Sequence, residues 1–213
     1  MPKGYTGRIL HADLTDERTW IEELPEVVYR RYLGGSALAS YLLLRDMPPD
    51  ADPLGPDNLL VFTTSVINGT PISGANRYTA AAKSPLTGGF GEAEAGGFWG
   101  PELKFSGYDG IVVHGAATKP VYLWINNVED PDKPGVVEFR DASHLWGKLA
   151  QEVQTGLETE LKEKRIRVLQ TGVAGENLVR YAALVNQCRH FHGRAGLGAV
   201  MGSKKLKAIA VRG

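Results

Sequence analysis

The chain has few of the residues that would place it in several common protein classes. Its one cysteine, Cys188, excludes an internal disulfide and an iron–sulfur or zinc–thiolate site built by this chain alone. No apolar run reaches the roughly 18 residues that a transmembrane helix needs. The first residues, MPKGYTGRILHADL, lack the apolar segment of a signal peptide. We therefore expect a cytoplasmic protein with no membrane span.

An excess of charge is also lacking. Lysine and arginine total 24, aspartate and glutamate total 24, and the formal net charge is zero. A protein that coats nucleic acid needs a clear basic excess, so no nucleic-acid partner is expected. The 43% hydrophobic and 23% charged content is ordinary for a globular protein with a real core. No Ser/His/Asp order or carboxylate pair indicates a catalytic centre, and the pair Glu22-Glu23 is interpreted as a solvated face.

Glycine, in contrast, is abundant and concentrated. Residues 74–108 hold eight of the 26 glycines, and a second glycine-rich run covers residues 193–202. The first run ends in Gly100-Pro101-Glu102, which is typical of a helix start with Pro101 in the first position. A glycine-rich segment that leads into a helix can bring backbone N–H groups close to a phosphate. The alternative is a set of tight turns between strands, because the spacing matches no Walker or Rossmann motif.

Apolar patterns predict the secondary structure on either side of these runs. Strands are expected at residues 8–14, 19–24, 59–64, 77–82, 110–115, 121–126, 136–140, 166–169, 180–183 and 208–213. Helices are expected at residues 26–32, 36–45 and 144–163, the last with Ser143 as N-cap, and a short one is expected to begin at Ser203.

These elements occur in the same order twice, about 100 residues apart. Each series contains a hairpin, a helix, a strand, an Arg-Tyr segment, a glycine run, a helix start and an apolar strand. The order predicts an α+β fold with two antiparallel-rich sheets related by a pseudo-two-fold axis and a few flanking helices. The internal halves would be residues 1–115 and 116–213. Two similar glycine cradles on one face would suit a ligand with two like halves.

Several long motifs carry a resemblance to a known family. They include GANRYTAAAKSPLTG at 74–88, GGFWGPELKFSGYDGIVVHG at 96–115, AGENLVRYAALVN at 174–186 and GLGAVMGSKKLKAIAV at 196–211. With these motifs the chain resembles the N-terminal domain of the tungsten-containing aldehyde ferredoxin oxidoreductase family, over residues 1–213. The resemblance implies a base of two sheets on which a bis-pterin tungsten cofactor (tungstopterin) lies, with molybdenum as the other metal to consider.

The resemblance also implies an activity and partners. Members of the family oxidise aldehydes to carboxylic acids and pass the electrons through a [4Fe–4S] cluster to ferredoxin; a related branch reduces aromatic-ring thioesters. The cluster cysteines and the substrate pocket belong to later helical domains, so this chain is expected to be inactive without them. The resemblance leaves the substrate and the oligomeric state, including a homo-oligomer, open.

Two side chains, Arg77 and His190, stand at positions where family members contact the cofactor. Arg77 matches an arginine between a pterin and the cluster, where a guanidinium offers a fixed fork of donors and offsets the anionic cluster. His190 matches an arginine near a phosphate. Because the segment 189–196 departs from the family pattern, Arg189 or Arg194 is an alternative phosphate contact.

Four further positions are implied as backbone contacts. Glu94 and Phe191 match residues whose backbone carbonyls bind a Mg²⁺ ion that joins the two pterin phosphates. Gly96 and Gly193 match glycines that let the backbone approach the cofactor. Glu94 replaces the usual asparagine, and its carboxylate would repel phosphate unless it points away or joins the magnesium.

Three other hypotheses compete with this one. A non-catalytic binding or scaffold protein could have kept the fold and lost the cofactor. A stand-alone nucleotide-phosphate binder lacks a Walker-type motif. The string Cys188-x-His190-x-His192 would place three metal ligands on one face of an extended segment, but a fourth ligand or open position would still be needed.

Overall fold

The computed structural model describes residues 4–127 and 133–213, and its strands form two six-stranded sheets. The first sheet contains β1 (Arg8–Asp13), β2 (Arg18–Glu23), β3 (Leu60–Thr64), β4 (Tyr78–Lys83), β5 (Phe90–Ala95) and β6 (Gly110–His114). The second contains β7 (Val121–Asn126), β8 (Val136–Asp141), β9 (Arg167–Thr171), β10 (Leu184–Asn186), β11 (His190–His192) and β12 (Leu206–Arg212).

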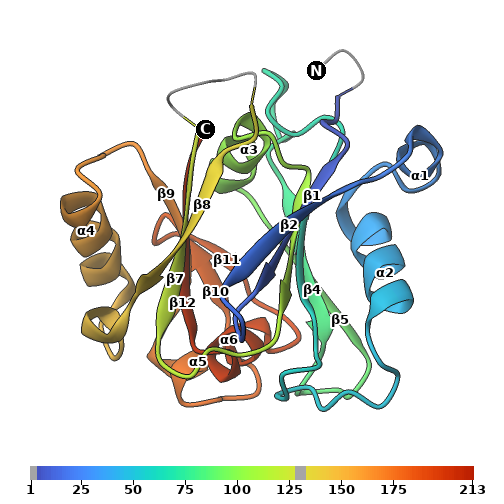
Figure 1. The fold of residues 1–213 in the computed structure, drawn as a ribbon. Coiled ribbons are helices and arrows are strands. Elements are labelled where there is room, and N and C mark those ends of the chain that lie inside the picture. The colour runs from blue at the N-terminus through green and yellow to red at the C-terminus, as the bar shows by residue number, and fades with distance from the viewer. Residues whose placement is uncertain (1–3, 128–132) are drawn as a thin grey trace.

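The two sheets have the same topology. Their strand orders are β2-β1-β6-β3-β4-β5 and β8-β7-β12-β9-β10-β11, so each strand of one sheet has a counterpart in the other. The equivalent pairs β1–β6 and β7–β12 are parallel, and the remaining neighbours are antiparallel. The chain leaves the first sheet after β6 and enters the second at β7 (Figure 1). This confirms the predicted α+β fold with two related, antiparallel-rich sheets.

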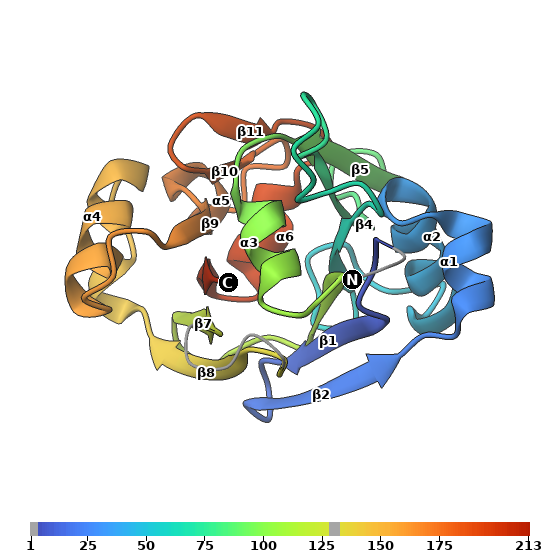
Figure 2. The same ribbon diagram turned by 90° about the horizontal axis from the view of Figure 1, so that it is seen from above.

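The helices also correspond between the two halves. Helices α1 (Glu26–Tyr32) and α2 (Gly35–Asp46) precede β3, and the 3₁₀ helix η1 (Ser143–Leu145) and α4 (Ala150–Glu160) precede β9. Helix α3 (Trp99–Phe105) precedes β6, and α6 (Leu197–Ser203) precedes β12, while the short α5 (Val173–Glu176) lies against α6. Figure 2 shows α3 and α6 between the sheets, with α2 and α4 on opposite outer sides.

The core therefore has an inner layer between the sheets and an outer layer on each side. On β3, Leu60 and Phe62 belong to the inner cluster, whereas Val61 packs in the cluster beneath α2. Val153 and Leu157 of α4 cover the outer face of the second sheet. A strand buried on both faces reads as a continuous apolar run, which is why residues 59–64 were recognisable as a strand.

The long helix predicted at residues 144–163 is wrong. The structure forms η1, then an extended connection with Gly147 at φ 81°, and only then α4. Ser143 begins η1 and does not cap α4; the α4 N-cap is Leu149, whose N–H donates to Glu152 Oε2 at 2.8 Å. Helix α4 then continues through Gly156 to Glu160.

Three smaller expectations are also wrong. Residues 180–183 form a turn and not a strand, and the chain enters β10 only at Leu184. Ser203 ends α6 instead of opening a helix, because residues 197–202 of the second glycine run are already helical. Helix α3 begins at Trp99, so Pro101 is its third residue; its missing N–H costs nothing there, since the first four N–H groups of a helix have no partner within it.

A candidate cofactor cradle where the two sheet edges meet

Strands β5 and β11 bring the two halves of the molecule together at one place. Each is the last strand of its sheet, and the two lie against each other (Figure 2). The approach is close: a Cβ built on Gly91 of β5 would lie 2.6 Å from the Cβ of Ala195. The Ser84 hydroxyl donates to the Ala195 carbonyl at 2.8 Å, which adds a polar contact between the halves.

The loop that follows β5 crosses directly over the turn between β10 and β11. Gly97 has φ 91°, and a Cβ there would lie 2.5 Å from Asn186 Oδ1 and 2.7 Å from Gln187 Oε1. Only glycine satisfies both the left-handed backbone and this contact. The glycine-rich segment thus lets the loop pack directly on the side chains of the β10–β11 turn, as the sequence suggested for a turn or cradle.

Two side-chain amides join this loop to the turn. The Phe98 N–H donates to Gln187 Oε1 at 2.6 Å. Asn186 Nδ2 donates to the Tyr78 hydroxyl at 2.9 Å and to the Gly96 carbonyl at 3.2 Å. Neither amide was singled out from the sequence, because no local pattern marks a neutral side chain whose partner lies about 90 residues away.

The structure places five of the six predicted site residues on these two edge strands or directly after them. Glu94 is exposed on β5, and Gly96 follows that strand. His190 and Phe191 lie in β11, and Gly193 follows it. The two sets meet, since a Cβ on Gly96 would lie 3.7 Å from His190 Nδ1.

Arg77 comes from the neighbouring strand. Tyr78 of β4 pairs with Ala95 of β5, so Arg77 stands one residue beyond that pair, beside Gly96. Its side chain is exposed, and its carbonyl accepts a hydrogen bond from Asn68 Nδ2 at 2.9 Å. Arg77, Glu94, Gly96 and His190 therefore lie near one end of β5, while Gly193 lies further along, toward Ala195, which contacts Gly91.

The chemistry of this region fits an anionic, flat group. Among the described residues, no atom lies within 4 Å of a Cβ position at Gly193, and the nearest atom at Gly96 is at ordinary contact distance. Neither has a positive φ, so the chain's own packing does not require glycine at either position. The exposed guanidinium groups of Arg77, Arg189 and Arg194 have no ion-pair or hydrogen-bond partner within the described ranges, and they could face phosphate.

The C-x-H-x-H string does not form a metal site in the described residues. His192 is fully buried with its ring edge-on to Tyr78 at 4.7 Å, and desolvation lowers its pKa to about 3. Cys188 lies in the turn, where burial raises the pKa of its thiol. No group of three potential ligands among residues 4–127 and 133–213 is arranged to hold a metal ion.

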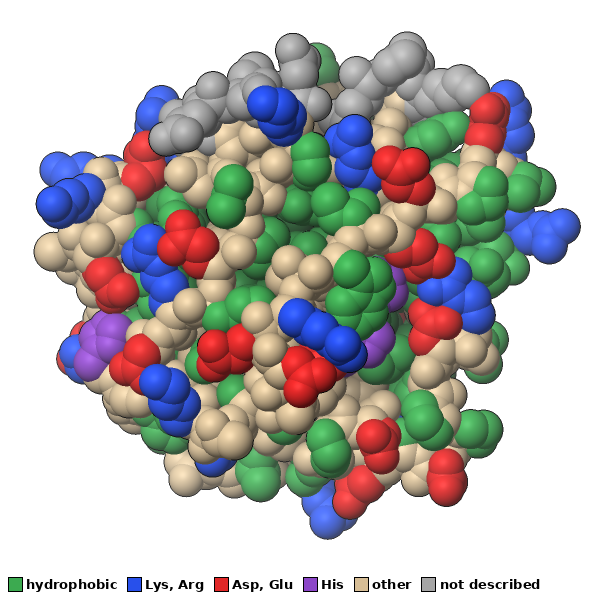
Figure 3. All heavy atoms as spheres, viewed as in Figure 1, with side chains coloured by type: hydrophobic (Ala, Val, Ile, Leu, Met, Phe, Trp, Pro, Cys, Tyr) green, Lys and Arg blue, Asp and Glu red, His purple; other side chains and the backbone are tan. Residues whose placement is uncertain are grey.

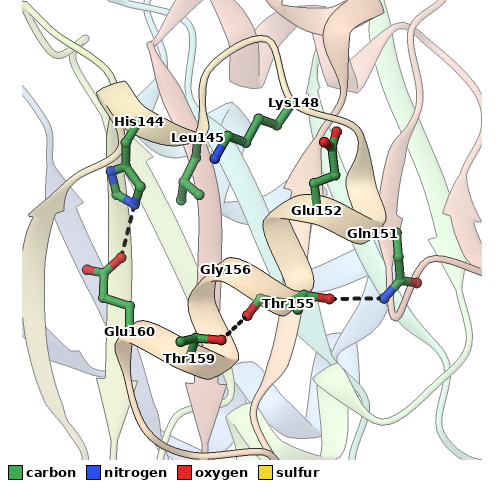
Figure 4. A pocket seen from close by; sticks show the side chains of 9 residues that line it. All are labelled: His144, Leu145, Lys148, Gln151, Glu152, Thr155, Gly156, Thr159 and Glu160. Carbon is green, nitrogen blue, oxygen red and sulfur yellow. Dashed lines mark hydrogen bonds and ion pairs between the residues drawn. The ribbon is translucent and has the colours of Figure 1, made fainter.

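A separate groove lies elsewhere on the molecule. It measures about 640 Å³ and runs between η1 and α4. His144 and Glu160 close one end through a 3.1 Å contact (Figure 4). Because α4 covers the outer face of the second sheet, this groove is remote from β5 and holds none of the predicted site residues.

On the face seen in Figure 3, acidic and basic side chains are interspersed, and no large area carries charge of one sign alone. Among the described residues, no helix is long and apolar enough to cross a membrane.

Comparison with known proteins agrees with this architecture. Residues 9–213 match the family model described as "Aldehyde ferredoxin oxidoreductase, N-terminal domain". The chain is 47% identical over 210 residues to a tungsten-containing aldehyde ferredoxin oxidoreductase of Thermococcus kodakarensis, covering 99% of this chain and 34% of that protein. It is 36% identical to the WOR-like subunit of an aliphatic sulfonate oxidoreductase of Pyrococcus furiosus, covering 98% and 34%.

A solved structure shows the same fold. The active-site complex BamBC of benzoyl-coenzyme A reductase, with 1,5-dienoyl-CoA, superposes with a TM-score of 0.92 at 42% identity, covering 99% of this chain and 31% of the other. The two equivalent sheets that meet at β5 and β11 are thus the fold of this family's N-terminal domain. The chain belongs to the aldehyde ferredoxin oxidoreductase family, and it spans about a third of the length of these relatives.

Proposed function

We propose that residues 1–213, with halves at about 1–115 and 116–213, form the cofactor-binding base of a tungsten bis-pterin oxidoreductase. The observation that carries the proposal is the meeting of β5 and β11. It gathers Glu94 and Gly96 from one half and His190, Phe191 and Gly193 from the other at one edge. A cofactor with two similar pterins suits a surface built from two equivalent halves.

In this proposal each half holds one pterin. The open backbone at Gly96 and Gly193 lets the pterins approach, and the carbonyls of Glu94 and Phe191 bind the Mg²⁺ ion between their phosphates. Edge strands suit this role because their outward carbonyls have no strand partner on that side. Arg77 and His190 face the anionic groups, with Arg189 and Arg194 as further cations.

The bound cofactor would supply two-electron chemistry, with tungsten preferred over molybdenum because four relatives are named as tungsten-containing. We infer aldehyde oxidation to a carboxylic acid, with ferredoxin as electron acceptor, in the cytoplasm. The remaining two thirds of such a protein would supply the cysteines of the [4Fe–4S] cluster and the substrate pocket, so the base would be inactive by itself.

Elemental analysis of the native assembly tests this proposal. We expect tungsten, magnesium and iron in the wild type and at least a several-fold loss of tungsten in Arg77→Met, because the neutral side chain no longer offsets anionic charge. Arg31→Met is the matched control, since Arg31 is exposed on α1 and remote in sequence from the cradle. An assembly without tungsten or molybdenum would overturn the catalytic proposal and leave the scaffold alternative.

Two alternatives have specific support. The superposition with benzoyl-coenzyme A reductase favours an aromatic thioester as a second candidate substrate, which assays of the metal-loaded assembly with both substrate classes would distinguish. The exposed carboxylate of Glu94 favours the scaffold, because it stands where phosphates would lie. Glu94→Gln should raise tungsten retention if that carboxylate repels phosphate.

A further inference from the structure

The crossing of the β5 loop over the β10–β11 turn sets the relative position of the two halves of the cradle. Gly96, which precedes the loop residues Gly97 and Phe98, belongs to the first half, and His190 follows the turn in the second. Any group that contacts both halves depends on this crossing being held in one geometry.

Asn186 holds the crossing from inside. Its side chain is fully buried, and Nδ2 points at three acceptors: the Tyr78 hydroxyl at 2.9 Å, the Gly96 carbonyl at 3.2 Å and the His190 carbonyl at 3.5 Å. The two carbonyls determine the orientation of the amide, because Oδ1 in that place would face other oxygens. The same –NH₂ group therefore bonds one residue from each half of the cradle.

Gln187 holds the crossing from outside. Its Oε1 accepts the Phe98 N–H at 2.6 Å, so a second amide bonds the loop two residues further along. Gln187 has φ 49°, a conformation in which glycine would be relaxed. Glycine, however, has no side chain that could accept the hydrogen bond from the Phe98 N–H. The disfavoured backbone conformation at Gln187 therefore coincides with a side chain that makes a contact glycine could not make.

We propose that Asn186 and Gln187 are positioning residues that clamp the β5 loop onto the β10–β11 turn and thereby fix the spacing of the two cofactor-binding halves. This inference rests on the proposed function, because it assigns the clamp a role in retaining the pterin cofactor. It adds two residues, neither of which contacts the cofactor in this scheme, to those that the resemblance implied.

Gln187 gives the sharper test because its half-buried side chain can be shortened without opening the core. In the native assembly, Gln187→Ala should raise hydrogen exchange at the Phe98 amide about 2- to 10-fold, the factor expected for loss of an ordinary hydrogen bond. Tungsten release during incubation with EDTA should accelerate by a similar factor. Gln187→Glu keeps an oxygen acceptor and should restore both rates.

Gln151→Ala is the matched control, since Gln151 is exposed on α4 and bonds only Thr155 of the same helix. The proposed clamp is contradicted if Gln187→Ala and Gln151→Ala show equal rates of hydrogen exchange at the Phe98 amide. Faster exchange with unchanged tungsten release would overturn the cofactor role. A wild-type assembly without tungsten or molybdenum would instead overturn the proposed function and the cofactor role together, while the exchange data would still report on the clamp.

Discussion

At the scale of single residues, a histidine pair on the first sheet shows how contacts can reverse an expectation from sequence. His11 Nδ1 lies 2.9 Å from His114 Nε2, and His11 Nε2 lies 3.0 Å from Glu22 Oε2. Glu22 also accepts two hydrogen bonds from Arg45, at 2.7 and 2.8 Å. The interpretation of Glu22-Glu23 as a solvated face is therefore wrong for Glu22, which β2 presents to these partners, while Glu23 is exposed.

The histidine pair predicts a pH-dependent stability. Burial, and the His11 ring beside it, lower the pKa of His114 from 6.5 to about 4. In that interval the unfolded chain binds a proton at His114 that the folded chain does not, so the free energy of unfolding should fall as the pH drops from about 6.5 to about 4. Above pH 6.5, His114 is neutral in both the folded and the unfolded chain, so this loss in the free energy of unfolding is absent.

Urea unfolding at a series of pH values measures this dependence. His114→Gln removes the titrating group and should lessen the decline between pH 6.5 and 4. His144→Gln, at an exposed histidine on the other half, should decline like the wild type. Equal slopes for His114→Gln and the wild type would show that His114 does not titrate as described.

A buried ion pair between Lys207 and Glu176 predicts a large effect of a small substitution. Lys207 has no exposed side-chain surface and Glu176 has 3%. Glu176→Gln keeps the acceptor for the Gly147 N–H but leaves the Lys207 ammonium without a buried counter-charge. We expect a loss of about 3–5 kcal/mol in the free energy of unfolding, measured with urea. Glu23→Gln at an exposed position is the control; a loss below about 1 kcal/mol for Glu176→Gln would contradict the pairing.

At the scale of elements, helices α5 and α6 pack through bare backbone. A Cβ on Gly202 would lie 2.0 Å from the Gly175 carbonyl oxygen, and one on Gly175 would lie 2.4 Å from the Gly198 carbonyl oxygen. Helix packing thus requires glycine at this part of the second glycine run. The sequence pattern had been interpreted as a ligand-binding feature, and here part of it has a purely structural cause.

Gly202→Ala should therefore be severe. A backbone oxygen cannot move aside as the end of a flexible side chain can, so we expect a loss of about 3 kcal/mol, at the upper end of overpacking costs. Gly172→Ala is the comparison, because no atom in the described part of the chain lies within 4 Å of a Cβ there. Thermal unfolding of both variants measures the difference, and similar midpoints would contradict the close packing of α5 on α6.

Elements with strong apolar patterns were predictable from sequence, and those stabilised by distant contacts were not. Strands such as β3 and β7 are buried on both faces and read as continuous apolar runs. Strand β5 reads FGEAEA, a composition rich in alanine and glutamate that disfavours a strand, and it forms because β4 pairs along its length. Strand β11 has three residues, too few for any periodic signal.

The candidate site likewise contains residues that could be predicted from the sequence and residues that could not. The six implied positions came from the family resemblance, since a glycine or a backbone carbonyl ligand has no signature of its own. Asn186 and Gln187 could not be found, because their partners Gly96 and Phe98 lie 90 and 89 residues away. Only the topology, which places the last strand of each sheet side by side, brings these groups into contact.

At the scale of the whole molecule, the residues that stabilise the fold and the residues proposed to bind the cofactor lie in different places. The equivalent strands and helices of the two halves bury a common inner core, whereas the edge formed by β5 and β11 faces outward. Substitutions in the first set should change folding. Substitutions at the open glycines of the edge should change only what binds there.

Gly193→Ala tests this separation directly. No atom of the residues that the structure describes lies within 4 Å of a Cβ at Gly193, and its φ is not positive, so the free energy of unfolding should stay within about 0.5 kcal/mol of the wild type. If a pterin packs against this backbone, the added methyl group occupies its space, and tungsten content in the native assembly should fall several-fold. Gly89→Ala, at the opposite end of β5 from Gly96, is the matched control, since its nearest atom is at 3.9 Å. Full tungsten content in Gly193→Ala would place the cofactor away from Gly193, whereas a large loss of stability would mean that the glycine is needed by the fold itself.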